Sequence, residues 1–436
     1  MVSHLSSHLL DELFQRRLDR RQIRKIVRHL LTGCALCSPD GGARPRPQDY
    51  SSAFAAALKA TTDASRALAA ERAEAPERLR EIAVQPFYRQ WIMVTDSPRF
   101  RTWAFCELLL DACEEWGFRD PPRALQAARL GVEVADRLDR ERYGGDRVDD
   151  LRARAWATLG NAERILTDFR AAEKSFSKAE RLIRSGTGDP LEKARLLLLE
   201  ASLRGHQQRF AEAFRMLRQV VRIARRCGDE HLCGRALITQ GFLASMAQEP
   251  ELAIRLLQEG LPLIDAAAEP RLVLAARHNL IVGLTDSGRP QEALALLEES
   301  RPLYEQHGDP FSVIRMSWLE GRIALCLGNL CGAEALLVKS RCRLVEQGQG
   351  YDAALLSLDL AQVYARQSRG SEMRCLAEEM LLIFQSREIR REAVSALLVF
   401  QKAAAIEGVT LGLLQELRDY LQESRSTPGL RFRDPF

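Results

Sequence analysis

The chain has 436 residues, with 63 basic and 59 acidic side chains, so its formal net charge at neutral pH is only +4. This balance excludes a chain-wide polycation of the kind that coats nucleic acid or a membrane surface. Aromatic residues make up 6% of the chain, whereas Leu, Ala, Arg and Glu are common. Because those four residues favour helices and β-branched residues are few, the composition predicts an all-α protein.

Residues 1–38 are predicted to form a compact helical module with the spacing of a metal site. His29, Cys34 and Cys37 give the pattern His-x4-Cys-x2-Cys. Zinc takes four nitrogen or sulfur ligands, and two residues between the thiols let the chain fold back around one ion. Spacing favours His4 over His8 as the fourth ligand. A metal-free fold with two plain thiols is also compatible with the sequence. The predicted zinc ligands are His4, His29, Cys34 and Cys37.

This module resembles the zinc-binding anti-sigma domain, a small helical domain with His-x3-Cys-x2-Cys after an upstream His. The present chain has one more residue between His29 and Cys34. The resemblance implies bound zinc and a transcription-associated partner such as a sigma factor. Release of that zinc on thiol oxidation would provide a redox switch. Residues 16–28 carry a net charge of +6, which favours docking onto an acidic protein first and onto DNA second. A solvated helix face is the alternative.

The next segments differ in composition. Residues 39–49 are rich in Gly and Pro and are predicted to be a linker. Residues 50–98 form an Ala-rich helical linker region, with an interruption expected at Pro76. Residues 99–423 are predicted to be helices in short units. Residues 424–436 are predicted to be a flexible C-terminal tail, with docking of this tail into a groove as the minority alternative.

Two sets of residues repeat with a period of about 40 in the segment 99–423. Small residues recur early in apolar helices at Ala172, Ala213, Ala253, Ala293 and Ala333, and Met373 and Leu413 continue this series. Glycines recur in the turns at Gly188, Gly228, Gly308 and Gly348, three of them followed by Asp. A Gly ends a helix in the left-handed conformation and an Asp caps the next helix. The two series predict a repeated helical hairpin.

The unit AWATLGNAERILTDFRAAEKSFSKA, residues 155–179, resembles the tetratricopeptide repeat. Its matching residues are Trp156, Leu159 and Gly160 in the first helix and Ala172, Phe176 and Ala179 in the second. The resemblance implies an all-α, right-handed superhelical solenoid of hairpins over residues 99–423, if the divergent unit at Trp103–Leu138 is included. It also implies that the first helices line a concave groove, which binds a peptide or a partner helix.

The groove columns of such a repeat carry several Arg residues here. The predicted groove residues are Arg154, Asn161, Arg195, Arg235, His278, Arg315, Trp318 and Arg322. An Arg column favours an acidic peptide or a carboxylate, because guanidinium groups bind carboxylates in pairs of hydrogen bonds. Ordinary helix-surface charge is the alternative, since Asp150 and Glu192 lie within one turn of Arg154 and Arg195. Arg235 and Arg315 have no acid within one turn.

The function predicted from these features is that of a non-enzymatic, regulatory scaffold or adaptor that binds a protein or peptide in the groove. A DNA-binding transcriptional regulator with the repeats as its sensor is the alternative. No phosphate loop, nucleophile elbow or His-Glu-x-x-His motif is present, and the dispersed Cys residues of the repeats are expected to pack in the core. The sequence contains no stretch of 18 apolar residues that would predict a membrane span, and we expect a cytoplasmic location.

Overall fold

The computed structural model describes residues 47–117, 119–385, 400–404 and 409–426, together with Gln22, Ile26, Leu398 and Phe432. The chain divides into two compact units, Met1–Pro76 and Glu77–Phe436. All regular elements in the described ranges are helical, so the predicted all-α class is confirmed. None of the described helices is long and apolar enough to cross a bilayer.

Helix α3 (Pro47–Ala83) starts in the first unit and ends in the second, and it runs through Pro76 without a break. The interruption predicted at Pro76 is therefore wrong. A proline inside a helix removes one backbone hydrogen bond, and here strong helix formers on both sides (Ala before Pro76, and Glu, Arg and Leu after it) sustain the helix across that loss. Of the two described residues before α3, Gln22 is exposed and Ile26 is buried.

The second unit begins with a packed helical cluster. Ile82 at the end of α3, Val94 of α4 (Phe87–Asp96) and Phe100 of the short η1 (Pro98–Phe100) are buried in one core with α5 (Trp103–Trp116) and α6 (Pro121–Asp136). The segment 79–100 thus contributes Leu79, Ile82, Phe87, Met93, Val94 and Phe100 to the core of this unit. Asp120 caps the N-terminus of α6, because its carboxylate accepts a hydrogen bond from the backbone N–H of Arg123.

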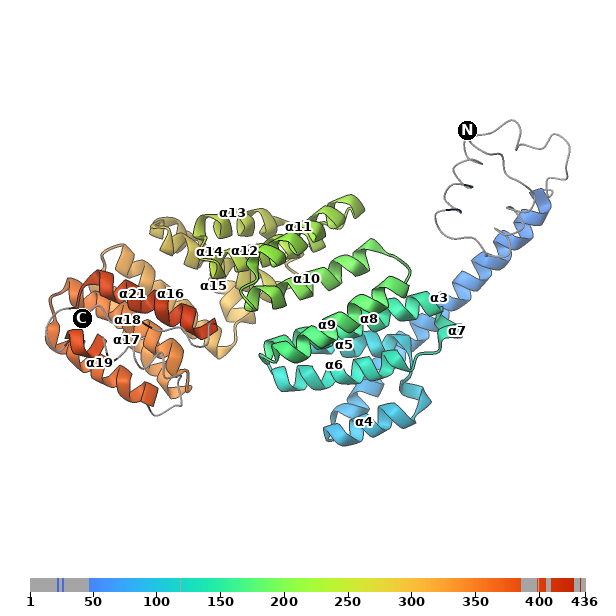
Figure 1. Ribbon diagram of the computed structural model, residues 1–436, viewed down its shortest axis with the longest axis horizontal. Coiled ribbons are helices and arrows are strands. Elements are labelled where there is room, and N and C mark those ends of the chain that lie inside the picture. Colours follow the sequence, from blue (N-terminus) through green and yellow to red (C-terminus); the bar gives the residue numbers. More distant parts are fainter. Residues whose placement is uncertain are drawn as a thin grey trace, which may run out of the picture. The chain divides into compact units, whose positions relative to one another are not determined.

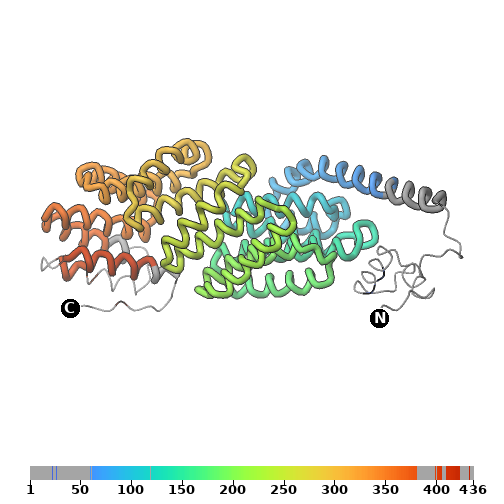
Figure 2. The backbone as a smooth tube through the Cα atoms, turned by 90° about the horizontal axis from the view of Figure 1, so that it is seen from above, coloured from blue at the N-terminus to red at the C-terminus, as the bar shows by residue number. Residues whose placement is uncertain are grey.

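In the described part of the chain, six hairpins follow the short helix α7 (Arg140–Tyr143). Their first helices are α8 (Gly145–Ile165), α10 (Pro190–His206), α12 (Glu230–Met246), α14 (Pro270–Asp286), α16 (Pro310–Cys326) and α18 (Gly350–Arg366). Their second helices are α9 (Phe169–Ser185), α11 (Phe210–Cys227), α13 (Pro250–Gly260, extended by η2, Leu261–Leu263), α15 (Pro290–His307), α17 (Leu330–Glu346) and α19 (Gly370–Gln385). The last described helix is α21 (Leu411–Ser426). Figure 1 shows this order, and Figure 2 shows the successive helices stacked side by side.

The period of about 40 residues is set by the turns. The carboxylates of Asp168, Asp189, Asp229 and Asp309 each accept a hydrogen bond from a backbone N–H in the first turn of the helix that follows. The turn from first to second helix holds one residue of positive φ in every hairpin. These residues are Thr167, Gln208, Gln248, Gly288, Gly328 and Ser368. The left-handed position is thus a structural requirement of each hairpin, and four hairpins meet it without glycine.

The two sets of helices form different layers. Consecutive first helices contact one another, and each second helix packs between its own first helix and the next one. First helices are buried on several sides, whereas a second helix such as α11 buries one stripe: Ala213, Leu217, Val220 and Ala224. Within a hairpin the helices approach closely, since a Cβ on Gly160 would lie 3.0 Å from the Phe176 ring. The first helices therefore form the inner layer of the array, as the tetratricopeptide resemblance implies.

Candidate protein-interaction surface

We define the inner surface as the side chains of α8, α10, α12, α14, α16 and α18 that do not pack against a second helix. Its N-terminal part is crossed by a shared ion pair. Glu192, in the first turn of α10, accepts from Arg154 Nε of α8 at 3.2 Å and from Arg195 at 2.9 Å. Burial acts to lower the pKa of Arg154, but the hydrogen bond and charge of Glu192 outweigh it and the pKa is raised. Arg154 thus binds the next first helix, and Arg195 binds the first turn of its own helix.

The same arrangement recurs between α12 and α14. Glu269 at the start of α14 accepts from Arg235 at 3.1 Å and lies 2.7 Å from His231 Nε2. The absence of an acid within one turn of Arg235 is therefore irrelevant, because its partner lies 34 residues further on. In both pairs, an acid at the start of one first helix contacts an arginine of the preceding first helix, at a separation of 38 or 34 residues. A search limited to one helical turn misses these pairs.

A different cluster occupies the C-terminal ends of α8 and α10. Arg164 donates to Asn161 Oδ1 at 3.0 and 2.9 Å, and its guanidinium lies 3.4 Å from the ring nitrogens of His206. Burial lowers the pKa of Arg164 to about 10. Burial, and then the charge of Arg164, lowers the pKa of His206. The hydrogen bonds of Arg164 in the described region go to neutral groups, so this guanidinium is a cation without a carboxylate partner.

The C-terminal part of the inner surface centres on Asp359 of α18, which is 1% exposed. The indole N–H of Trp318 donates to Asp359 Oδ2 at 2.6 Å, and Arg322 Nε lies 3.8 Å from the same oxygen. Arg322 also pairs with Asp286 at the end of α14. The third neighbour of Asp359 is Arg418 of α21, which donates to Asp359 Oδ1. Trp318 and Arg322, predicted as separate groove residues, are thus joined through one buried carboxylate.

The two remaining predicted groove residues, His278 and Arg315, differ in their surroundings. His278 is 8% exposed and forms a hydrogen bond with the hydroxyl of buried Tyr304, so its imidazole belongs to the core between α14 and α15. Arg315 is exposed, and its guanidinium lies 5.8 Å from the centre of the Phe311 ring. The imidazole of His278 is thus part of the core, whereas the Arg315 side chain is accessible to solvent.

The cysteine prediction holds only in part. Cys106, Cys113 and Cys233 are buried, as expected for core thiols. The remaining described cysteines are exposed, because they fall on the outer side or at the ends of their helices: Cys227, Cys326, Cys331, Cys342 and Cys375. The predicted zinc ligands His4, His29, Cys34 and Cys37 lie outside the described residues. Elsewhere in the described chain no group of three or more His, Cys, Asp or Glu side chains is arranged to hold a metal ion.

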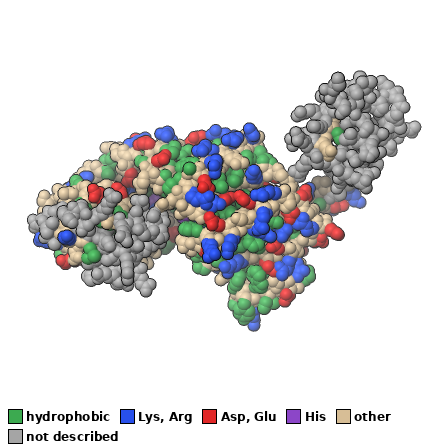
Figure 3. Space-filling model, viewed as in Figure 1, with side chains coloured by type: hydrophobic (Ala, Val, Ile, Leu, Met, Phe, Trp, Pro, Cys, Tyr) green, Lys and Arg blue, Asp and Glu red, His purple; other side chains and the backbone are tan. Residues whose placement is uncertain are grey.

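The outside of the second unit carries one apolar patch. Val84, Tyr88 and Ile92, on and just before α4, are more than half exposed, and Trp91 is 36% exposed. Figure 3 shows this patch as green side chains at α4, while positive and negative side chains are interspersed over the middle hairpins. The interspersed charges agree with the many Arg–carboxylate pairs between and within repeats.

The hairpin geometry, the 40-residue lattice and the inner layer of first helices define a tetratricopeptide-like helical-repeat solenoid. No protein-family model matches the sequence, and no curated protein matches it significantly. Solved structures share its fold. One is a Rap protein complexed with competence and sporulation factor, with a TM-score of 0.53 and 12% identity over 74% of this chain and 87% of that chain. Another is the apo form of the quorum sensor NprR from B. thuringiensis, with a TM-score of 0.52 and 17% identity over 73% and 90%. At these identities the likeness shows the fold alone.

Proposed function

We propose that this chain is a non-catalytic regulatory scaffold that binds a protein or peptide on its inner surface. The solenoid supports this proposal because first helices stacked side by side offer a long surface to an extended or helical ligand. The similar Rap structure is itself a complex with competence and sporulation factor, and the similar NprR is a quorum sensor. Both are similar in fold only, so the ligand of the present chain has to be deduced from its own side chains.

The observation that carries the proposal is the Arg164 cluster. A half-buried guanidinium that is bonded to neutral acceptors costs desolvation energy, and a carboxylate would offset that cost with paired, charge-assisted hydrogen bonds. Arg164 and His206 come from adjacent first helices, so a ligand that contacts both bridges two repeats. We therefore propose an acidic peptide segment as the ligand at the N-terminal part of the inner surface.

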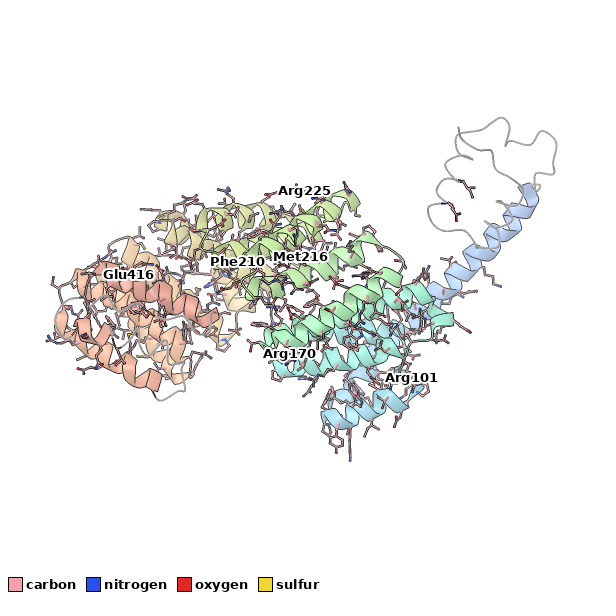
Figure 4. The ribbon with its side chains drawn as sticks, in the orientation of Figure 1. Arg101, Arg170, Phe210, Met216, Arg225 and Glu416 are labelled. Atoms are coloured by element: carbon pink, nitrogen blue, oxygen red, sulfur yellow. The ribbon has the colours of Figure 1, made fainter. Side chains whose placement is uncertain are left out.

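Selection of peptides from a random displayed library on the purified full chain tests this proposal. We expect enrichment of Asp- and Glu-containing peptides, and we expect Arg164→Gln to weaken their binding about tenfold, which corresponds to about 1.4 kcal/mol for one charge-assisted contact. Arg170→Gln is the matched control, since Arg170 is an exposed arginine on the second helix α9 (Figure 4). A library that yields no binders contradicts the scaffold function. Equal binding to the two variants contradicts the role of Arg164.

At the N-terminus we propose a zinc-binding module on the spacing of His4, His29, Cys34 and Cys37 alone. The basic residues 16–28 would then dock onto an acidic, transcription-associated protein. Metal analysis of the purified chain and of a Cys34→Ser/Cys37→Ser variant tests the zinc site, and absence of zinc from the parent chain rules it out. Binding of the full chain to mixed-sequence DNA at low salt tests the competing DNA-binding function.

A further inference from the structure

The C-terminal helix α21 departs from the repeat. In sequence it continues the series of second helices, because Leu413 lies 40 residues after Met373. In space it packs against α18, the first helix of the preceding hairpin. Among the described helices no other second helix packs extensively on the first helix of the hairpin before it. Helix α21 therefore occupies a place beside a preceding first helix that no other described second helix takes.

That place is on the inner surface. The charged neighbours of Arg418 include Arg322 of α16 and Asp286 of α14, both on first helices, and Asp359 of α18 is its direct partner. Figure 1 shows α21 beside α18. The burial of α18 agrees with this contact, since every residue from Asp352 to Ala361 is buried between α21 and the other helices packed on α18. In the corresponding stretch of α16, Arg315 remains exposed.

The contact has the form of a ligand in a groove. Leu414, Leu417 and Leu421 form one fully buried stripe of α21, in the same core as the α18 side chains. Arg418 lies within that stripe and is 6% exposed, so its charge is buried against Asp359. Burial, and then the charge of Arg322, lowers the pKa of Arg418 to about 9, which leaves it protonated at neutral pH. Together these residues make up a helical recognition motif. The leucine stripe packs against α18, and the buried arginine fixes the position of the helix along it.

We propose that the inner surface around Asp359 is a binding site for an amphipathic helix of the pattern Leu-x-x-Leu-Arg-x-x-Leu, which α21 fills within the chain and a partner helix of the same pattern fills by displacing it. Trp318 and Arg322 hold the Asp359 carboxylate in place, and the partner's arginine replaces Arg418 on it. This inference rests on the proposed scaffold function and names the class of partner at the C-terminal part of the surface. The site takes a basic residue, whereas the Arg164 end takes an acidic one.

The probe is a fluorescent peptide of residues 409–426, and the readout is its anisotropy with the intact chain. We expect weak binding to the parent chain, in which α21 fills the site. We expect at least about tenfold tighter binding to the chain with Arg418→Ala, because loss of one partner of a buried ion pair weakens the hold of α21 on Asp359. The peptide should also restore the melting temperature of that variant. Glu416→Ala is the matched control, since Glu416 lies on the exposed side of α21 (Figure 4) and its loss should leave peptide binding at the parent level.

A second measurement places the Arg418→Ala substitution in the peptide instead of in the chain. A protease site inserted between Ala404 and Val409 allows α21 to be cut from the folded chain, and the parent peptide is then compared with its Arg418→Ala form. We expect the cut chain to bind the parent peptide at least about tenfold more tightly than the altered one. Equal binding of the two peptides, equal binding to cut and uncut chains, or unfolding of the chain on cutting would each overturn the proposal. Such a failure, with Arg164-dependent selection of acidic peptides intact, leaves the scaffold function in place.

Discussion

The imidazole of His278 and the phenol of Tyr304 share a hydrogen bond of 2.7 Å between Nδ1 and Oη, inside the core that joins α14 to α15. The rings meet edge to face, with their centres 6.2 Å apart. Burial, followed by the charges of Arg315 and Arg322, holds the pKa of His278 well below its ordinary value of 6.5. This histidine therefore remains neutral in the folded chain under conditions in which it is protonated in the unfolded chain.

The first prediction concerns acid stability. Below pH 6.5 the unfolded chain gains a proton on His278 that the folded chain does not, so the free energy of unfolding falls as the pH falls, by up to about 1.4 kcal/mol per pH unit for this one group. Above pH 6.5 the contribution vanishes. His278→Gln should remove that slope while its amide keeps a hydrogen bond to Tyr304. Urea denaturation at pH 7.5 and 5.5 measures it, and parallel pH profiles for parent and variant would contradict the assignment.

The second prediction concerns the left-handed residue of each hairpin turn. Gln248 has a φ of 61°, and Gly288 has a φ of 71° at the equivalent turn of the next hairpin. Gln248→Gly should raise the free energy of unfolding by about 0.5–1 kcal/mol, because glycine adopts this conformation without a Cβ clash. Gly288→Ala should lower it by about 1 kcal/mol, although open space surrounds the new methyl group. Urea denaturation of both variants provides the check, and two changes of the same sign would refute the turn requirement.

The third prediction concerns the helix crossing inside a hairpin. A Cβ on Gly241 would lie 2.7 Å from Leu257 Cγ, which is fully buried. Overpacking of about 1–3 kcal/mol exceeds the helix propensity that alanine adds, about 1 kcal/mol, so Gly241→Ala should lower the melting temperature. Gly412→Ala is the control, because its Cβ has only an ordinary contact with Thr410 at 3.8 Å in the first turn of α21. That variant should melt no earlier than the parent chain.

The fourth prediction concerns thiol reactivity. Burial raises the pKa of Cys113 to about 12 and that of Cys106 further still, so the thiolate that reacts with electrophiles is scarce at both. Brief alkylation of the native chain, read by mass spectrometry of its peptides, should label Cys227, Cys326, Cys331, Cys342 and Cys375. Cys106, Cys113 and Cys233 should be labelled only after denaturation. Rapid native labelling of Cys106 would place it outside the core.

The sequence predicts the hairpins well because their determinants are local. The small residues at helix crossings, such as Gly160 against Phe176, and the Asp caps recur at a fixed period that can be read without a structure. The αL position between first and second helices was missed, since Thr167, Gln208 and Gln248 do not look like turn residues. They adopt positive φ because the packed helices on both sides fix the turn.

The candidate site was predicted less fully, because its contacts span a whole repeat. Arg154 was assigned to the groove with Asp150 as a possible partner, but its partner is Glu192, 38 residues further on. The repeat alignment predicts His278 in the groove, but its side chain is buried in the core beside Tyr304. Nothing in the local pattern of α21 distinguishes it from the other second helices, so its place against α18 required the structure.

The carboxylate of Glu192 serves one arginine from its own hairpin and one from the hairpin before it. Glu269 likewise lies directly before α14 and binds Arg235 and His231 of α12. The 40-residue unit is consequently a period of the backbone and not an interchangeable module. Excision or transplantation of one hairpin would leave an unpaired charge in the neighbouring hairpin. An engineered array of these units therefore has to change the carboxylate and its arginine partners together, in both repeats.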